Sequence, residues 1–219
     1  MRAPLTDRSL AHGARALGRV DADLAGVLSR HGTPPLWGRE PGFATLVQII
    51  LEQQVSLASG RAAFERVLHA TGRMTPARVA RLSERRLRGA GLTRQKAEYV
   101  RGLALAVVRG ALDLGAIAAM DDEAAHAELT KVRGIGPWSA NIYLLMALGR
   151  RDVWPSHDLA LAGAMREVKR LRRMPTPERQ LAISEPWRPW RAVAARILWH
   201  HYLSTPRVRV GAAQKTSRR

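Results

Sequence analysis

Residues 131–148, KVRGIGPWSANIYLLMAL, join a short glycine-rich turn directly to a long apolar stretch. Gly134 and Gly136 stand one residue apart, and glycine permits positive φ at no steric cost. Pro137 suits the first position of a helix, where its missing N–H costs no hydrogen bond. The pattern predicts a helix ending at Arg133, a tight hairpin with Ile135 tucked between the helices, and a second helix. Free backbone N–H groups at the start of that helix would bind a phosphate without reading a base.

Two other glycine-rich phosphate sites do not fit this stretch. A dinucleotide-binding turn follows a strand, whereas a helical pattern precedes Gly134 here. A P-loop requires Gly-Lys-Ser/Thr, which is absent after Gly136. An ordinary helical corner with glycine C-caps stays open as an alternative. We therefore predict a helix-hairpin-helix that cradles a DNA backbone.

The rest of the chain has a helical pattern and no sign of a membrane span. Apolar residues recur at helical spacing in residues 42–56, 93–108 and 186–203, and Thr93 is a candidate N-cap.

No apolar run approaches the roughly 20 residues that cross a bilayer. The arginine-rich N-terminus contains Asp7, Asp21 and Asp23, which transit peptides avoid, so it is predicted to be the first helix. Only residues 208–210 hint at a strand, and the expected fold is all-α.

The 219 residues include no cysteine. Disulfides, thiolate zinc sites, cysteine nucleophiles and cysteine-ligated iron–sulfur clusters are thereby excluded. The histidines lack metal-binding spacing, so no catalytic metal is expected. The absence of cysteine agrees with a reducing compartment, and we expect a cytoplasmic protein associated with the nucleoid through DNA.

The chain is strongly basic. It has 36 basic and 18 acidic residues, a net charge of +18, and such a field attracts polyanions. Nucleic acid is the first candidate partner. Only four of the basic residues are lysines, however, and a GC-rich coding bias toward arginine would also raise the charge. Acidic lipid is less favoured, because the basic residues are not gathered on one amphipathic helix.

Asp158 follows a proline-containing loop and begins another apolar helix in GRRDVWPSHDLALAGAM. Helix N-caps are the commonest role for such an aspartate. Next to a DNA-binding hairpin, the same carboxylate would also place a negative charge near a deoxyribose. Both roles stay open on the residues alone.

Four stretches together resemble one family. They are LVQIILEQQVSLASG (46–60), GLTRQKAEYVRGLA (91–104), LTKVRGIGPWSANIYLLMAL (129–148) with DVWPSHDLAL (152–161), and EPWRPWRAVAARILW (185–199). In this order they resemble the helix-hairpin-helix/Gly-Pro-Asp DNA glycosylase superfamily, and within it the 3-methyladenine DNA glycosylase II branch. The resemblance covers residues from about 42 to 202.

The resemblance implies a single domain over residues 1–205 with two helical lobes and no iron–sulfur cluster. The central lobe is expected at about 52–148, with the hairpin at 132–137. The second lobe is expected to combine about 1–51 with 149–205. The basic tail 206–219 is expected to be disordered and to add loose phosphate contacts.

Asp158 is the catalytic carboxylate that the resemblance implies. Breaking an N-glycosidic bond builds positive charge on the sugar, which a carboxylate stabilises. Strand-cleaving relatives carry a lysine where this chain has Trp138, so a monofunctional enzyme is expected. Trp138 would stack on the flipped base, or alternatively fill the core. Tyr143 and Trp187 are further candidates for the base pocket, although the family aromatic often stands one residue before Tyr143.

The resemblance also implies the DNA contacts. Gln53, Gln54 and Val55 match the turn that enters the duplex, with Gln54 at the wedge position. The other expected DNA-binding residues are Lys96, Arg133, Gly134, Gly136 and Ser139. The hairpin carbonyls of Val132 and Gly134 are expected to hold a monovalent cation that bridges to phosphate. The expected partner is double-stranded DNA with a damaged base, bound by a monomer that needs no other cofactor.

Three functions are compatible with these residues. The preferred function is monofunctional excision of alkylated purines, with the range of bases open. Excision of deaminated bases such as hypoxanthine or uracil is a second enzyme hypothesis, in which the pocket must donate hydrogen bonds to a neutral leaving group. A damage-binding protein that no longer cleaves is the third, and the presence of Asp158 and Trp138 argues against it.

Overall fold

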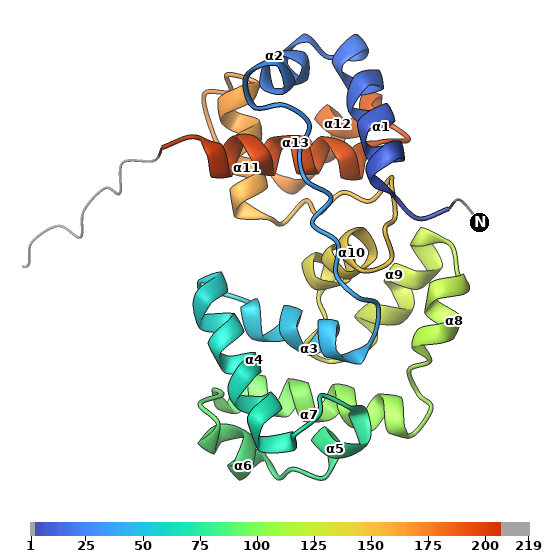
Figure 1. Cartoon of the computed structure of the whole chain (residues 1–219), viewed down its shortest axis with the longest axis vertical. Coiled ribbons are helices and arrows are strands. Elements are labelled where there is room, and N and C mark those ends of the chain that lie inside the picture. Colours follow the sequence, from blue (N-terminus) through green and yellow to red (C-terminus); the bar gives the residue numbers. More distant parts are fainter. Residues whose placement is uncertain (1–2, 207–219) are drawn as a thin grey trace, which may run out of the picture.

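The computed structural model describes residues 3–206, and these residues form helices without any strand, which confirms the expected all-α class (Figure 1). The helices are α1 (Asp7–Val20), α2 (Ala22–His31), α3 (Phe43–Glu52), α4 (Leu57–Thr71), α5 (Pro76–Ala80), α6 (Glu84–Gly89), α7 (Arg94–Val108), α8 (Leu114–Ala119), α9 (Asp122–Thr130), α10 (Pro137–Met146), α11 (Leu159–Val168), α12 (Pro177–Ser184), the 3-10 turn η1 (Glu185–Trp187) and α13 (Arg191–Ser204). No helix in this range is long and apolar enough to cross a bilayer. The predicted tail 206–219 lies outside the described residues, apart from Pro206.

The helices form two lobes, and the lobe boundary differs from the expected one. The terminal lobe contains α1, α2, α11, α12 and α13, and the central lobe contains α3 to α10 (Figure 1). Residues 42–51 were expected in the terminal lobe, but α3 packs against α4, α7 and α10. Eight of the ten residues of α3 are buried, because the helix is apolar on nearly all sides and needs packing partners on each of them. The boundary therefore lies near residue 42 rather than 51.

Arg196 of α13 ties the two lobes together from the inside. Its side chain is 1% exposed and its guanidinium donates to three backbone carbonyls. The acceptors are Leu36 in the segment between α2 and α3 (2.7 Å), Leu145 of α10 (2.9 Å) and Ala192 of α13 (3.0 Å). Burial lowers the pKa of Arg196 to about 10, so the guanidinium still carries its charge at neutral pH. The two lobes are thus joined by charge-assisted hydrogen bonds.

The predicted hairpin is present between α9 and α10, with two differences. Ile135 is buried between these helices as expected, but α9 ends at Thr130, and residues 131–136 form the turn. Gly134 has φ +95°, and a Cβ there would lie 2.4 Å from Cγ of Tyr99 on α7. Gly136 has φ −84° with open space around it, so positive φ is needed only at Gly134.

A polar cluster fixes the interior of the terminal lobe. Asp21 caps α2 and accepts hydrogen bonds from Lys169 Nζ (2.6 and 2.7 Å) and from Trp187 Nε1 (2.7 Å). Lys169 also pairs with Asp23 at 2.9 Å. Burial alone would raise the pKa of Asp21, but the hydrogen bonds from Lys169 and Trp187 outweigh it, and the pKa is lowered. The cluster joins α2, the end of α11 and η1.

We expect Asp21→Asn to lower the free energy of unfolding by about 2 to 3 kcal/mol at pH 7, because it breaks a largely buried ion pair. A lowered folded-state pKa stabilises the fold fully above the unfolded value of about 3.9, and this stabilisation is lost as the pH falls through the folded value. The difference between wild type and variant should therefore shrink below about pH 4. Urea unfolding at several pH values measures it. The exposed Asp7→Asn serves as control, and an equal pH dependence for both variants would contradict the assignment.

Gly134→Ala should destabilise the fold by at least about 1 to 3 kcal/mol and weaken DNA binding, because alanine disfavours φ +95° and its Cβ meets Tyr99. Gly136→Ala should change stability by no more than about 0.5 kcal/mol, since its Cβ enters open space. Thermal unfolding and DNA affinity of both variants test the contrast. Equal tolerance at the two positions would show that the turn geometry is wrong.

Candidate active site

The Asp158 carboxylate receives three hydrogen bonds. Oδ1 accepts from the backbone N–H of Leu161 (2.8 Å) and from Trp199 Nε1 (3.3 Å), and Oδ2 accepts from Trp138 Nε1 (3.0 Å). Asp158 is therefore the N-cap of α11, one of the two roles left open by its position in the sequence. It also lies beside Trp138, the first residue after Pro137 of the hairpin. Capping alone does not account for the two indole donors.

The two indoles come from different lobes. Trp138 belongs to α10 of the central lobe, and Trp199 to α13 of the terminal lobe. A carboxylate offers about four lone-pair positions, so the three donors leave roughly one position open. This open position is on Oδ2, which accepts one hydrogen bond, whereas Oδ1 accepts two. Asp158 itself is partly exposed, and its neighbours His157 and Leu159 are exposed. A negatively charged oxygen with a fixed orientation thus stands where the lobes meet.

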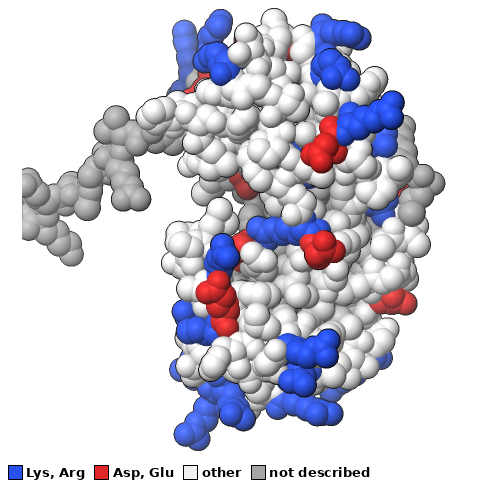
Figure 2. Space-filling view, in the orientation of Figure 1, with Lys and Arg blue, Asp and Glu red and all other residues white. Residues whose placement is uncertain are grey.

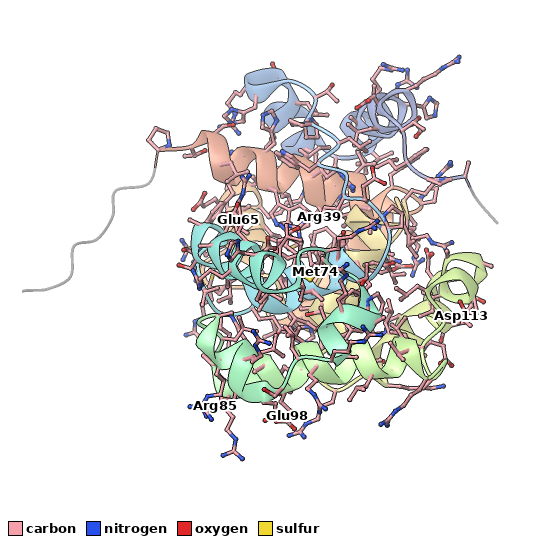
Figure 3. The ribbon with its side chains drawn as sticks, turned by 60° about the horizontal axis from the view of Figure 1, so that its bottom comes forward. Arg39, Glu65, Met74, Arg85, Glu98 and Asp113 are labelled. Carbon is pink, nitrogen blue, oxygen red and sulfur yellow. The ribbon has the colours of Figure 1, made fainter. Side chains whose placement is uncertain are left out.

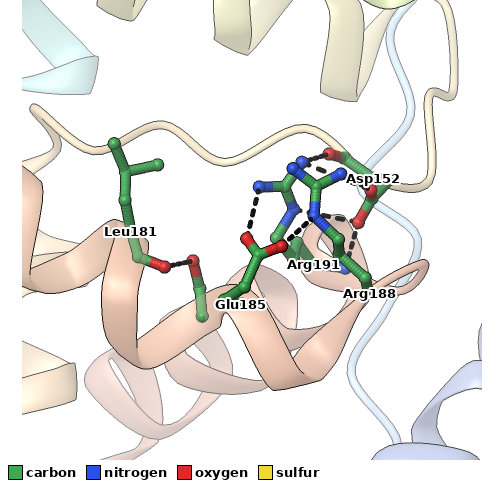
Figure 4. Close-up of polar contacts among 6 residues, drawn as sticks. Asp152, Leu181, Glu185, Arg188 and Arg191 are labelled. Atoms are coloured by element: carbon green, nitrogen blue, oxygen red, sulfur yellow. Dashed lines mark hydrogen bonds and ion pairs between the residues drawn. The ribbon is translucent and has the colours of Figure 1, made fainter.

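The loop that carries Asp158 is held by charged contacts at its beginning (Figure 4). Asp152 accepts from Arg188 Nη1 (2.7 Å) and from Arg191 Nε (2.9 Å), and its backbone carbonyl also accepts from Arg191 Nη2 (2.7 Å). Further along the loop, Asn141 Nδ2 donates to the carbonyl of Trp154 (3.2 Å). The loop is thereby attached to α10 on one side and to the start of α13 on the other. Sequence reasoning missed Asp152 and Asn141, because charged and amide side chains near turns are common.

Gln53 links the end of α3 to the hairpin. Its Nε2 donates to the carbonyl of Gly134 (2.9 Å) and to Oγ of Ser139 (2.8 Å). The Ser139 side chain is 2% exposed, so only its backbone N–H, in the uncapped first turn of α10, is available for a phosphate. The Gln53 amide nitrogen and the Ser139 hydroxyl thus bind each other, and a DNA contact by Gln53 or Ser139 stays a prediction.

The turn after α3 is exposed and has an unusual backbone. Gln54 has φ +57°, in the left-handed region, and Val55 is 46% exposed. Ser56 caps α4 immediately afterwards, so the turn is fixed at both ends. A non-glycine residue with positive φ is often found at a functional site. Entry of Gln54 and Val55 into a duplex stays a prediction.

Lys96 and Arg133 have protein partners. Lys96 Nζ donates to the carbonyl of Leu51 at 2.7 Å, and burial lowers its pKa. Arg133 is exposed and pairs with Glu98 of α7. Lys96 therefore holds the end of α3, and a phosphate contact by either side chain stays a prediction.

Tyr143 and Trp187 do not line a base pocket, contrary to expectation. Tyr143 is 1% exposed and its hydroxyl accepts from the N–H of Gly42 (3.0 Å); burial raises its pKa. Trp187 is 1% exposed and donates to Asp21 in the terminal lobe. Trp199 is the tryptophan of the C-terminal motif that reaches Asp158. A buried indole N–H needs an acceptor, but the sequence does not show which of several tryptophans faces which acceptor.

The carbonyls expected to hold a cation are already hydrogen-bonded once. Val132 O accepts from the N–H of Ile135 (2.9 Å), and Gly134 O accepts from Gln53. Each carbonyl keeps a second lone pair, so the cation stays a prediction that these contacts allow.

Comparison with known proteins agrees with this geometry. Residues 47–189 match the family model described as HhH-GPD superfamily base excision DNA repair protein. The chain is 29% identical to the Bacillus subtilis protein YfjP over 80% of this chain and 64% of that protein. It is 28% identical to DNA-3-methyladenine glycosylase 1 of Schizosaccharomyces pombe over 74% of this chain and 72% of that protein.

A solved structure supports the same placement. The Schizosaccharomyces pombe 3-methyladenine DNA glycosylase Mag1, in complex with abasic DNA, superimposes with a TM-score of 0.79 at 25% identity. The superposition covers 86% of this chain and 95% of that one. With a family model matching well over half of the residues, the chain belongs to the HhH-GPD superfamily of base excision DNA repair proteins.

Proposed function

We propose that this protein is a DNA glycosylase that hydrolytically removes alkylated purines of the 3-methyladenine type from duplex DNA. The observation that carries the proposal is the Asp158 carboxylate, held by two indoles at the meeting of the lobes and next to the hairpin. The relatives named 3-methyladenine glycosylases support the choice of substrate. Action as a monomer without a cofactor is part of the proposal.

The chemistry suits a carboxylate with a fixed orientation. As the bond between C1′ and the base breaks, positive charge grows on the deoxyribose, and a negative oxygen nearby stabilises that charge. The open lone-pair position on Asp158 Oδ2 is free to face this sugar or to orient the attacking water. N–H donors that are already in place hold the carboxylate without reorganisation during the reaction.

Removal of an alkylated purine requires little catalysis beyond this stabilisation of the positive sugar by a carboxylate. It carries a positive charge before cleavage and leaves as a neutral base, so no strong general acid is required. Trp138 has its N–H committed to Asp158, and its indole is half-buried, which leaves it suited to stacking rather than to donating to a base. Excision of deaminated bases would instead call for donors aimed at the leaving base.

The lysine contacts support a glycosylase that leaves the strand intact. Strand cleavage through a Schiff base needs a lysine amine at the reacting sugar. Each of the three lysines in the described range has a partner elsewhere: Lys96 on the Leu51 carbonyl, Lys131 on Glu128, and Lys169 on Asp21 and Asp23. Trp138 occupies the position next to the hairpin.

Asp158→Asn should lower the release of 3-methyladenine from methylated duplex DNA by roughly 100-fold or more, because the negative charge at the sugar is lost. The measurement is chromatography of free bases, together with gel analysis of the strand before and after alkali. We expect strand breaks only after alkali treatment with the wild-type protein.

Asp113→Asn is the matched control, since Asp113 is an exposed helix N-cap on α8, away from the site. It should release bases at the wild-type rate. Release by Asp158→Asn at that same rate would contradict the catalytic assignment. Strand breaks before alkali, or trapping by borohydride, would contradict the monofunctional mechanism.

A further inference from the structure

Within residues 3–206, most of the net positive charge is concentrated in one segment of the central lobe. Residues 57–96 carry ten basic and two acidic side chains. Residues 3–56 carry five of each sign, and residues 97–206 carry fifteen basic and eleven acidic side chains. A coding bias toward arginine would raise the charge along the whole chain, so it does not account for this concentration.

Nine arginines of this segment form what we name the arginine face: Arg61, Arg66, Arg73, Arg78, Arg81, Arg85, Arg86, Arg88 and Arg94. All nine are exposed. They project from α4, α5, α6, the turns between these helices and the first residue of α7, at the end of the central lobe far from the terminal lobe (Figure 2). Arg85 lies at the outer edge of α6, well away from Arg39 (Figure 3). The helices beneath are anchored by Val67, Val79 and Leu87, each 0% exposed, so the charges stand on a packed base.

Most of these guanidiniums have no carboxylate partner among residues 3–206. Arg61 pairs with Glu65, while Arg66 and Arg78 donate to the backbone carbonyls of Ala90 and Thr71. The remaining six make no ion pair with any described residue. Like charges gathered without counter-charges repel one another, and an external polyanion relieves that repulsion.

The arginine face continues from the turn expected to meet the lesion. α4 begins directly after Ser56, so Gln54 and Val55 stand at one end of this helix, and α6 lies beside its other half (Figure 1). Its 15 residues span about 22 Å at 1.5 Å per residue. At 3.4 Å per step of a DNA strand, that length corresponds to about six base pairs. The hydrogen bond from Arg66 Nε to Ala90 (2.7 Å) holds the α6–α7 turn against α4.

The chemistry of the arginine face favours duplex backbone over single strands. Single-stranded nucleic acid is held by aromatic side chains on which bases stack. Phe64 is the only tryptophan, tyrosine or phenylalanine between residues 57 and 96, and it is half-buried against the core. Guanidiniums alone bind phosphates without reading sequence.

We propose that the arginine face binds the phosphate backbone of duplex DNA flanking the damaged base, several base pairs from the flipped nucleotide. This inference rests on the proposed glycosylase function for the position of the lesion. The role of the arginine face is to raise the affinity for long duplexes, damaged or not, and so to hold the protein on DNA while it searches for a damaged base. It takes no part in breaking the glycosidic bond.

The test compares R85Q/R86Q/R88Q with R8Q/R15Q/R19Q, which removes three equally exposed charges from α1 at the opposite end of the molecule. Binding is measured on duplexes of about 30 and about 10 base pairs carrying a central abasic-site analogue, at several salt concentrations. On the long duplex, the α6 variant should bind at least roughly tenfold more weakly. Its slope of log K against log salt should be smaller by about 2 to 3, because each phosphate that the protein neutralises adds about 0.9 to the slope.

On the short duplex, whose ends stop before α6, the α6 variant should bind within about threefold of wild type. The α1 variant should match wild type on both duplexes. R81Q/R94Q, which changes the face outside α6, provides a second variant should the triple change disturb folding. Equal binding of the α6 and α1 variants to the long duplex would overturn the proposal.

Single-turnover base release separates this proposal from the proposed function. At saturating protein, the α6 variant should release 3-methyladenine at the wild-type rate. If wild type releases no base but the α6 variant still loses affinity for the long duplex, the glycosylase function fails and the arginine face stands. If release is normal and both triple variants bind alike, the arginine face fails alone.

Discussion

The hydrogen bonds between Asp158 and the two indoles are the interaction on which the rest of the structure depends. Trp138 comes from the central lobe and Trp199 from the terminal lobe, so the carboxylate is held only when the lobes are packed together correctly. An ionised group that accepts several N–H bonds is both stabilised and oriented. The chemistry we propose needs both properties, because the charge must already be in place when the sugar becomes positive.

Other contacts maintain this arrangement. Arg196, one turn before Trp199 on α13, donates to carbonyls of α10 and of the connecting segment, which fixes the two tryptophan-bearing helices relative to each other. Asp152 fixes the start of the loop that ends at Asp158. Gln53 places the exposed Gln54 turn against the hairpin. The parts that would hold DNA and the part that would cleave the glycosidic bond thus belong to one connected network.

Features set by neighbouring residues could be predicted from the sequence. The helices, the Thr93 cap, the hairpin with Ile135 inside it and the position of Asp158 at a helix start all follow from short-range patterns, whereas the hydrogen bond from Trp138 to Asp158 does not. The lobe boundary and the roles of Tyr143 and Trp187 could not be predicted, because they depend on partners far along the chain, such as Gly42 and Asp21. Gly136 shows the same limit, since spacing alone does not tell which glycine of a pair needs positive φ.

The indole N–H groups of Trp138 and Trp199 hold the Asp158 carboxylate in the orientation that the proposed reaction requires. The most direct measurement is the single-turnover rate of 3-methyladenine release by Trp199→Phe at saturating protein, with the affinity for abasic DNA measured in parallel. Phenylalanine keeps most of the packing and removes the donor. We expect a rate lower by about tenfold to 100-fold, which corresponds to the loss of one hydrogen bond to a charged group, with the affinity nearly unchanged. A wild-type rate in this variant would contradict this role of the indole N–H groups.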